Sequence, residues 1–150
     1  MSVQIRETPL TDEVLACLIQ FSQDWARENS CHGYRPNTRE DIAGNRIFLA
    51  EDGKERVGYL FGHIFRNEKR QSIMPEGAVC FEVEELYVIP SRRGQGIGAG
   101  LFRHACDALR DEADLVLLST ATKNWKAILH FYLEELGMEF WSARLFKRLR

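Results

Sequence analysis

One stretch decides the fold of this chain: Arg92-Arg93-Gly94-Gln95-Gly96-Ile97-Gly98-Ala99-Gly100. It follows an apolar run that ends at Pro90 and precedes a helical pattern that begins at Leu101. Glycine allows unusual backbone angles and the close approach of a ligand. The free N–H groups of a first helical turn attract anions, and Arg92 and Arg93 add cationic donors at the same point. The stretch therefore predicts an anion site suited to a pyrophosphate.

Three phosphate-binding schemes contain glycine-rich turns of this kind. A P-loop requires a lysine directly after its glycines, and none follows here. A dinucleotide fold requires G-x-G-x-x-G/A, which Gly94 to Ala99 satisfies, with Asp114 about twenty residues on. The strand before the turn nevertheless carries three acids, whereas a central dinucleotide-fold strand is almost wholly apolar. The acids disfavour the dinucleotide scheme, which we keep as a less favoured hypothesis. The third scheme is an R-x-x-G-x-G/A turn.

The apolar pattern predicts strands and helices on both sides of the turn. We expect strands at residues 3–5, 47–50, 57–65, 79–89 and 115–118, and a final strand or strand pair over 138–149. We expect helices at residues 12–28, from Thr38 or Asp41 onward, from the glycines to residue 109, and at 124–136. Asp52-Gly53 is typical of a hairpin turn. The predicted order is β-α-(α)-β-β-β-α-β-α-β.

Several details of these elements can be predicted. Gly58 and Gly62 are expected to break the strand at 57–65, and residues 66–77 to connect elements without packing. The run 115–118 is typical of a strand buried on both faces. The helix after the glycines is expected to bury Leu101, Phe102, Ala105, Ala108 and Leu109.

Length and composition are those of one domain over residues 1–150. Of its side chains 45% are hydrophobic and 28% charged, which is ordinary for a globular protein. A net charge of −2 gives no reason to expect a nucleic-acid partner, and no apolar run is long enough to span a membrane. The four cysteines lack metal-ligand spacing, so no metal site is expected. We expect a single cytoplasmic α/β (α+β) domain with helices around one sheet.

Two segments carry a family resemblance. The first is the strand end Leu86-Tyr87-Val88-Ile89-Pro90 with the turn Arg93-Gly94-Gln95-Gly96-Ile97-Gly98. The second runs from Asn124 to Met138 and reads N-x-x-A-x-x-x-x-Y-x-x-x-x-G-M. Together they resemble the GNAT superfamily of acyl-CoA N-acyltransferases, over residues 79–138. The resemblance implies a twisted, mixed antiparallel and parallel sheet, flanked by helices and splayed in the middle to hold coenzyme A.

The resemblance also implies acetyl-CoA as the cofactor. Backbone N–H groups of the turn are expected to hold its pyrophosphate, and the strand before it to bind the pantetheine arm through main-chain groups. A β-bulge that would open this strand is implied by the resemblance alone. Asn124 matches a cofactor-contacting asparagine and equally suits a helix N-cap. The expected cofactor-binding residues are Leu86, Tyr87, Val88, Arg93, Gly94, Gln95, Gly96, Ile97, Gly98, Ala99, Gly100 and Asn124.

Tyr132 matches a tyrosine that the family places near the thioester sulfur. A tyrosine hydroxyl can protonate a departing thiolate while its ring packs against apolar groups. The position equally suits a packing aromatic, because Ile128 and Leu136 lie one helical turn to either side.

The acceptor amine must lose a proton, and a carboxylate on the strand at 79–89 can take it directly or through water. Because side chains alternate along a strand, we expect Glu82 and Glu84 on the face of Leu86 and Val88, with Glu85 on the other face. Glu84 is the preferred general base and Glu82 the second choice. A solvated acidic strand face is the alternative.

Acids beside a thioester attract a cation, which favours a primary amine on a polyamine, an aminoglycoside-like molecule or a similar cationic molecule. The loop near the acceptor is expected to contribute Trp25, His32, Tyr34 and Arg35. The predicted function is an acetyl-CoA-dependent N-acetyltransferase. A non-catalytic acyl-CoA-binding domain and a protein N-terminal or lysine acetyltransferase are the alternatives. The resemblance further implies that the final strand, with its basic end, pairs across a homodimer.

Overall fold

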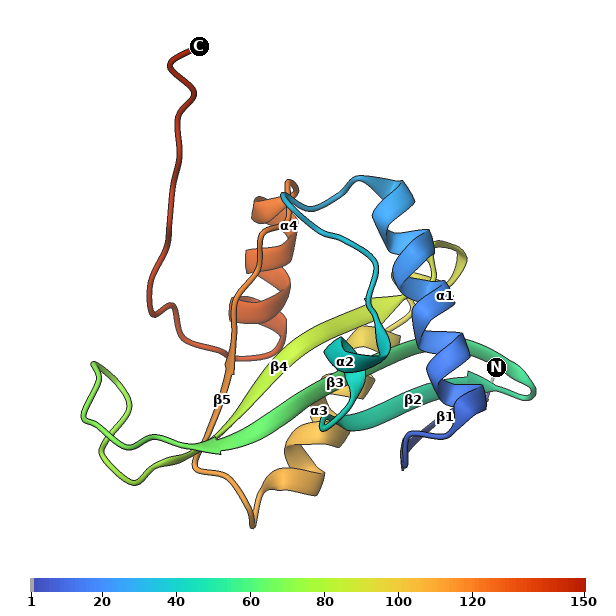
Figure 1. Ribbon diagram of the computed structural model, residues 1–150, viewed down its shortest axis with the longest axis horizontal. Helices are drawn as coiled ribbons and strands as arrows, with labels where there is room; N and C mark the ends of the chain where they lie inside the picture. The colour runs from blue at the N-terminus through green and yellow to red at the C-terminus, as the bar shows by residue number, and fades with distance from the viewer. Residues whose placement is uncertain (1) are drawn as a thin grey trace.

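A computed structural model describes residues 2–150 (Figure 1). Its sheet has the strand order β1-β2-β3-β4-β5, and β4 and β5 form the one parallel pair described. The strands are β1 (Val3–Thr8), β2 (Arg46–Asp52), β3 (Glu55–Arg66), β4 (Val79–Val88) and β5 (Leu115–Leu118). The helices are α1 (Asp12–Glu28), α2 (Arg39–Ile42), α3 (Ile97–Leu109) and α4 (Trp125–His130), which continues into a π-helical turn, Phe131–Glu135. The predicted mixed sheet flanked by helices is confirmed.

The ends of α1 and α2 follow from polar side chains at their boundaries. Thr11 caps α1, because its hydroxyl oxygen accepts a hydrogen bond from the Val14 N–H at 3.2 Å. Asn29 ends α1 in the left-handed region with φ 53°. Thr38 precedes α2, and its N–H donates to the Asp41 carboxylate at 2.8 Å. These contacts explain why the predicted boundaries at residues 12, 28 and 38 are confirmed.

Gly58 and Gly62 do not interrupt β3, so the predicted break is wrong. The strand is continuous over Glu55–Arg66. A Cβ added at Gly58 would lie 2.7 Å from the Tyr87 carbonyl oxygen, and one at Gly62 would lie 2.2 Å from the Glu82 carbonyl oxygen. These two glycines therefore allow β4 to approach β3 closely.

A β-bulge in β4 lies opposite Gly62. Phe61 pairs with Glu85 and Gly62 with Val83, so Glu84 is an extra residue with no partner on β3. The Glu82 carbonyl leaves no room for a side chain at Gly62. The glycine and the bulge therefore form one local arrangement. The bulge implied by the family resemblance is present.

The sheet buries a separate apolar cluster on each face. On one face α3 packs against strand residues such as Phe48, Leu60 and Phe81. On the other face α1 packs against Tyr59 and Phe61, among others. The predicted core face of α3 is confirmed except for Ala108, which is exposed because the buried stripe follows the four-residue spacing of Leu101, Ala105 and Leu109.

The connection at residues 66–77 packs more than predicted. Met74 is buried against Cys80 and Ala78. Asn67 is buried as well, and its side-chain amide donates to the carbonyls of Met74 at 3.1 Å and Pro75 at 3.0 Å. These hydrogen bonds fold the loop back on the end of the sheet.

Two further predictions about the C-terminal half are wrong. β5 is half-buried rather than buried on both faces, because it is an edge strand with β4 as its neighbour. Residues 138–150 form no strand and extend away from the sheet (Figure 1). With no strand beside this segment, Leu145 stays 94% exposed and Leu149 90% exposed. Within residues 2–150, no helix combines the length and apolar character needed to cross a membrane.

Candidate active site

β4 and β5 separate after four residue pairs. Their parallel pairing joins Cys80–Val83 to Leu115–Leu118 and ends there. Main-chain groups alternate sides along a strand, and the Ile89 N–H donates to the Val57 carbonyl of β3 at 2.9 Å. Leu86 and Val88 therefore direct their N–H and C=O groups to the open side of β4. An extended ligand can pair with a free strand edge of this kind.

The three strand residues expected to bind the cofactor differ in what they offer. Tyr87 is paired with Tyr59 of β3, and its hydroxyl donates to Glu28 at 3.0 Å. The Val88 carbonyl already accepts a hydrogen bond from Arg93 Nε at 2.8 Å. In the described part of the chain, the groups left free on this edge are those of Leu86 and the N–H of Val88.

The turn after β4 adopts backbone angles that favour glycine. Gly94 has φ 77° and Gly96 has φ 82°, both in the left-handed region. Gly96 is the N-cap of α3, so the N–H groups from Gly96 to Ala99 have no acceptor within the helix. A Cβ added at Gly94 or Gly96 would meet no atom within 4 Å. The open space and the unpaired donors fit a pyrophosphate anion.

The two later glycines serve packing. The Gly100 N–H donates to the Gly96 carbonyl at 3.0 Å, so it belongs to the helix. A Cβ at Gly100 would lie 3.0 Å from Ile5 Cδ1, which shows how closely α3 lies on β1. A Cβ at Gly98 would lie 3.6 Å from the Phe131 ring, in ordinary contact.

Arg92 and Arg93 are not free cationic donors, contrary to the prediction. Arg93 forms an ion pair with Glu28 at 2.7 Å and its guanidinium lies 5.4 Å from the centre of the Tyr87 ring. Arg92 pairs with Asp52 and Glu55, each at 2.9 Å. Both arginines therefore fix the turn to neighbouring elements, and the anion site rests on backbone N–H groups.

The bulge changes the side-chain alternation predicted for β4. Val83 packs with Leu86 on the α3 side of the sheet. Glu85 accepts a hydrogen bond from Tyr59, which belongs to the cluster on the α1 side. His63 lies two residues beyond Phe61 on β3, so it also faces the α1 side, and it pairs with Glu82 across the strands and contacts Glu84. The predicted separation of Glu82 and Glu84 from Glu85 is wrong, because the extra residue Glu84 reverses the alternation.

Glu85 is the functional candidate that the sequence interpretation missed. Its Oε1 accepts hydrogen bonds from the Tyr59 hydroxyl at 2.7 Å, the Asn37 amide at 2.9 Å and the Tyr34 hydroxyl at 3.2 Å. Burial raises the pKa of Glu85, although the three donors oppose the shift. The only signal for Glu85 in the sequence is an acidic residue on a strand whose neighbouring strand contains a glycine. This signal does not reveal the bulge.

The second carboxylate oxygen of Glu85 accepts none of these hydrogen bonds. Within residues 2–150, Arg56 Nε is the one side-chain nitrogen or oxygen that is both fully buried and without a hydrogen-bond partner. Glu85 Oε2, which has no such partner, is therefore not fully buried. A half-buried carboxylate that pairs with no basic side chain of the described residues and keeps one oxygen free can bind an ammonium group.

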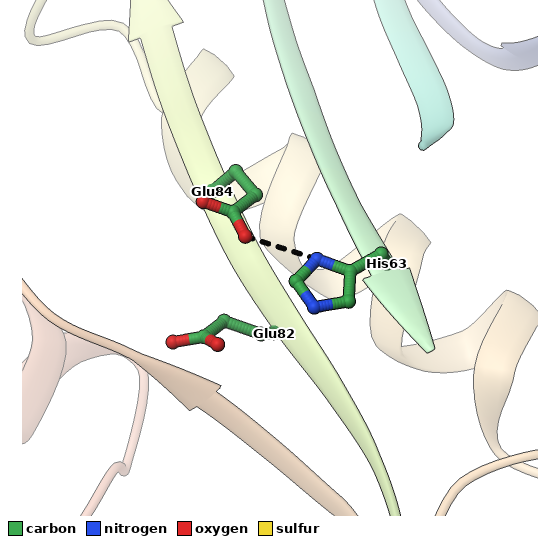
Figure 2. A group of neighbouring side chains, drawn as sticks. All are labelled: His63, Glu82 and Glu84. Atoms are coloured by element: carbon green, nitrogen blue, oxygen red, sulfur yellow. Dashed lines mark ion pairs between the residues drawn. The ribbon is translucent and has the colours of Figure 1, made fainter. Parts of the chain in front are cut away.

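His63, Glu82 and Glu84 form a second polar group beside the bulge (Figure 2). His63 Nδ1 lies 2.9 Å from Glu84 Oε1. The three residues each bring one nitrogen or oxygen within 4.8 Å of the others. The His63 side chain is 38% exposed and that of Glu84 is 43% exposed, so the group is accessible from solvent.

Tyr132 and Asn124 lie on the helical segment that follows β5. Tyr132 is half-buried beside Phe131, with ring centres 5.3 Å apart. Burial, and then the nearby Cys31, raise the pKa of Tyr132 to about 12, so its hydroxyl keeps its proton at neutral pH. Asn124 precedes α4, but its exposed side chain forms no capping hydrogen bond. Its amide is therefore available to a ligand.

Two of the four predicted substrate residues lie at this site, Trp25 near the end of α1 rather than on the predicted loop, and Tyr34 on the loop after α1. Trp25 contacts Tyr34, with ring centres 4.5 Å apart, and the Tyr34 hydroxyl donates to Glu85. His32 instead contacts Phe146, and Arg35 lies 3.6 Å from Asp41. The structure thus groups Trp25 and Tyr34 with the acids of β4, and places His32 and Arg35 outside that group.

Comparisons with known proteins agree with this geometry. The sequence profile of the Acetyltransferase (GNAT) family matches residues 15–138. Mycothiol acetyltransferase of Rothia mucilaginosa (strain DY-18) is 27% identical over 71% of this chain, which spans 30% of the length of that relative. A transcriptional regulator from Bacillus halodurans C-125 shares the fold with a TM-score of 0.73 at 24% identity, over 99% of this chain and 100% of that one. The aminoglycoside acetyltransferase meta-AAC0020 from an uncultured soil metagenomic sample superposes with a TM-score of 0.69 at 14% identity, over 99% of this chain and 97% of that one.

The family match includes the open edge of β4, the glycine turn and α4. It therefore rejects the dinucleotide interpretation of the turn. The chain belongs to the GNAT acetyltransferase family, whose cofactor is acetyl-CoA.

Proposed function

We propose that this protein transfers the acetyl group of acetyl-CoA to a primary amine of a cationic small molecule by direct attack of the amine. The observation that carries the proposal is the position of Glu82, Glu84 and Glu85 at the bulge where β4 separates from β5. The open edge of β4 suits the donor. The side of the sheet that carries these three glutamates, here called the acidic face, suits a cationic acceptor. The two substrates would then meet at the bulge.

Acetyl-CoA, when bound, supplies its acetyl group as a thioester. We assign its pyrophosphate to the N–H groups of the turn from Arg93 to Ala99, chiefly those from Gly96 onward, which start α3. The pantetheine arm is assigned to the main chain of Leu86 and Val88, and the amide of Asn124 to the same ligand. A rigid strand edge fixes the orientation of the donor before the reaction, which lowers the entropic part of the barrier.

The acceptor site is assigned to the α1 side of β4. Glu85 Oε2 is the proposed anchor for an ammonium group, since Tyr34, Asn37 and Tyr59 hold the other oxygen in place. Trp25 packs on Tyr34 and adds an aromatic surface, which favours cations. Acids and aromatic rings together support a polyamine, an aminoglycoside-like molecule or a similar basic amine.

Two proton movements accompany the transfer. The amine loses its proton to a carboxylate at the bulge, with Glu84 ahead of Glu82, acting directly or through water. Tyr132 is the proposed proton donor to the departing thiolate, because the resemblance places it near the thioester sulfur and its hydroxyl carries a proton at neutral pH. Phe131, the neighbour of Tyr132, reaches the first turn of α3. The helical segment that carries Tyr132 therefore lies close to the proposed cofactor site.

We also propose that the protein forms a homodimer through residues 139–150. The large apolar side chains exposed there are those of Phe140, Trp141, Leu145, Phe146 and Leu149. Contact with a second copy would cover these five side chains. The outer edge of β5 offers unpaired main-chain groups to an extended segment. The segment also carries four basic residues, whereas the chain as a whole has a net charge of −2.

Replacing Gly96 with glutamate is expected to abolish acetyl-CoA binding, because the new carboxylate would occupy the proposed anion site. Thermal shift with acetyl-CoA measures the effect. Gly44→Glu is the matched control, since Gly44 also has φ 82° and open space around it. Both variants carry the same backbone strain, so equal acetyl-CoA shifts in the two would refute the pyrophosphate assignment.

A panel of amines with acetyl-CoA and free-thiol detection tests the proposed acceptor class. Polyamines and aminoglycosides should be acetylated, and Glu85→Gln should raise their KM about tenfold or more, the value of a lost charged hydrogen bond. Peptide N-termini or lysines acetylated in preference would contradict the small-molecule assignment. Acetyl-CoA binding with no acetylated amine would favour a non-catalytic domain.

The same Glu85→Gln variant has a predicted pH signature. The pKa of Glu85 is raised in the folded state, so its contribution to stability is fully present below the unfolded pKa and is lost as pH rises through the folded pKa. Glutamine keeps an oxygen for the three donors and does not ionise. The variant should therefore gain in melting temperature relative to the wild type on going from acidic to neutral pH.

Tyr132→Phe removes the proposed proton donor and keeps the ring. Turnover should fall about a hundredfold or more, while the affinity for acetyl-CoA stays the same. Steady-state kinetics with an accepted amine, together with acetyl-CoA titration, provide both numbers. Unchanged turnover would assign Tyr132 to packing alone.

Sedimentation velocity tests the proposed dimer. The full chain should sediment as a dimer, and a chain ending at Met138 as a monomer, because the exposed apolar segment is removed. Leu145→Lys within the segment should weaken association. Ile64→Lys, at an exposed apolar position outside the segment on β3, is the control and should leave association unchanged. A monomeric full chain would overturn the proposal.

A further inference from the structure

His63 occupies a particular position on the acidic face. It lies on β3 opposite Glu82, next to Gly62 and the bulge. Strand alternation puts it on the face of Tyr59 and Phe61, the face assigned to the acceptor. Its side chain is 38% exposed, so α1 does not cover it as it covers those two aromatic rings. A molecule bound at the acidic face can therefore reach the imidazole.

The hydrogen bond to Glu84 fixes how His63 presents its ring. Nδ1 lies 2.9 Å from Glu84 Oε1. Figure 2 shows the second ring nitrogen turned away from Glu84, toward the side of Glu82. In the described residues, Nε2 forms no hydrogen bond. A carboxylate on one ring nitrogen places the proton there and leaves the lone pair on the other.

Two carboxylates lie beside the His63 imidazole. Glu82 and Glu84 of β4 are the charged side chains that face it, and the Phe65 ring lies 5.9 Å away on β3. Glu82 and Glu84 form no ion pair with a lysine or arginine of residues 2–150. Two carboxylates can therefore stabilise an imidazolium between them.

An imidazole is also the better proton acceptor at neutral pH. Histidine is the side chain that enzymes use most often as a general acid or base. Amines of the proposed class are protonated in solution, so a proton must leave the nitrogen before it attacks the thioester.

We infer that His63 Nε2 takes the proton of the acceptor amine, and that Glu84 positions the imidazole. This inference rests on the proposed function and assigns the proton to the imidazole of His63 in place of the Glu84 carboxylate. The ammonium N–H bond breaks as the Nε2–H bond forms, and the electron pair stays on the acceptor nitrogen. The imidazolium later releases the proton to water. His63 is then a catalytic residue, and Glu84 is a positioning residue.

The test compares His63→Gln, Glu84→Gln and a control, His130→Gln, which removes an exposed histidine on α4. An amine accepted by the wild type is used, and kcat/KM is measured against pH. His63→Gln should lose about a hundredfold or more and should lack the acidic limb of the profile. Glu84→Gln should lose less, with the limb retained at a different pH. His130→Gln should match the wild type.

Two further readouts separate catalysis from folding. Acetyl-CoA should bind all three variants with unchanged affinity in a thermal shift titration. Added imidazole should restore part of the turnover of His63→Ala, because it can occupy the vacated space. A His63→Gln variant that keeps the acidic limb, with Glu84→Gln losing it, would overturn the inference and make Glu84 the direct base.

The outcome for the wild type separates this inference from the proposed function. A wild type that acetylates no amine overturns both. A wild type that acetylates an amine, with His63→Gln equally active at every pH, overturns only the role of His63.

Discussion

The close approach of β4 to Gly62 is the constraint on which the rest of the site depends. The Glu82 carbonyl oxygen lies only 2.2 Å from the position that a Cβ of residue 62 would take, so any larger residue there would force the two strands apart. At this point β4 contains one extra residue, Glu84. A bulge bends its strand and increases the local twist. The bend coincides with the point at which the β4 and β5 pairing ends.

One local irregularity therefore has two consequences for function. Beyond the bulge, the main chain of Leu86 and Val88 faces an open edge, which suits an extended donor. The same inserted residue reverses the side-chain alternation, so that Glu85 joins Glu82 and Glu84 on the α1 side. The open edge of β4 and the acidic side of the sheet thus arise together from a single insertion.

Contacts of Arg93 then connect the open edge of β4 and the α1 side of the sheet to the glycine turn. Arg93 binds Glu28 at the end of α1, the Val88 carbonyl on β4, and the face of the Tyr87 ring. The arginine that the sequence suggested as a phosphate ligand therefore holds α1 against the turn. Trp25 lies on the same helix and contacts the Tyr87 ring. The position of the Trp25 ring therefore depends on the contact that fixes the turn.

Most helices and strands, and the shape of the glycine turn, follow from local signals in the sequence. Apolar spacing, the Thr11 cap and the Asp52-Gly53 turn are local signals, and the glycines at 94 and 96 encode backbone angles that other residues avoid. The sequence also supplied the acids, the tyrosine and the family resemblance. Tertiary structure alone decided which acids share a face, because a bulge depends on a partner strand that is distant in sequence. For the same reason it decided the pairing of Glu84 with His63, the enclosure of Glu85 by Tyr34, Asn37 and Tyr59, and the exposed course of residues 138–150.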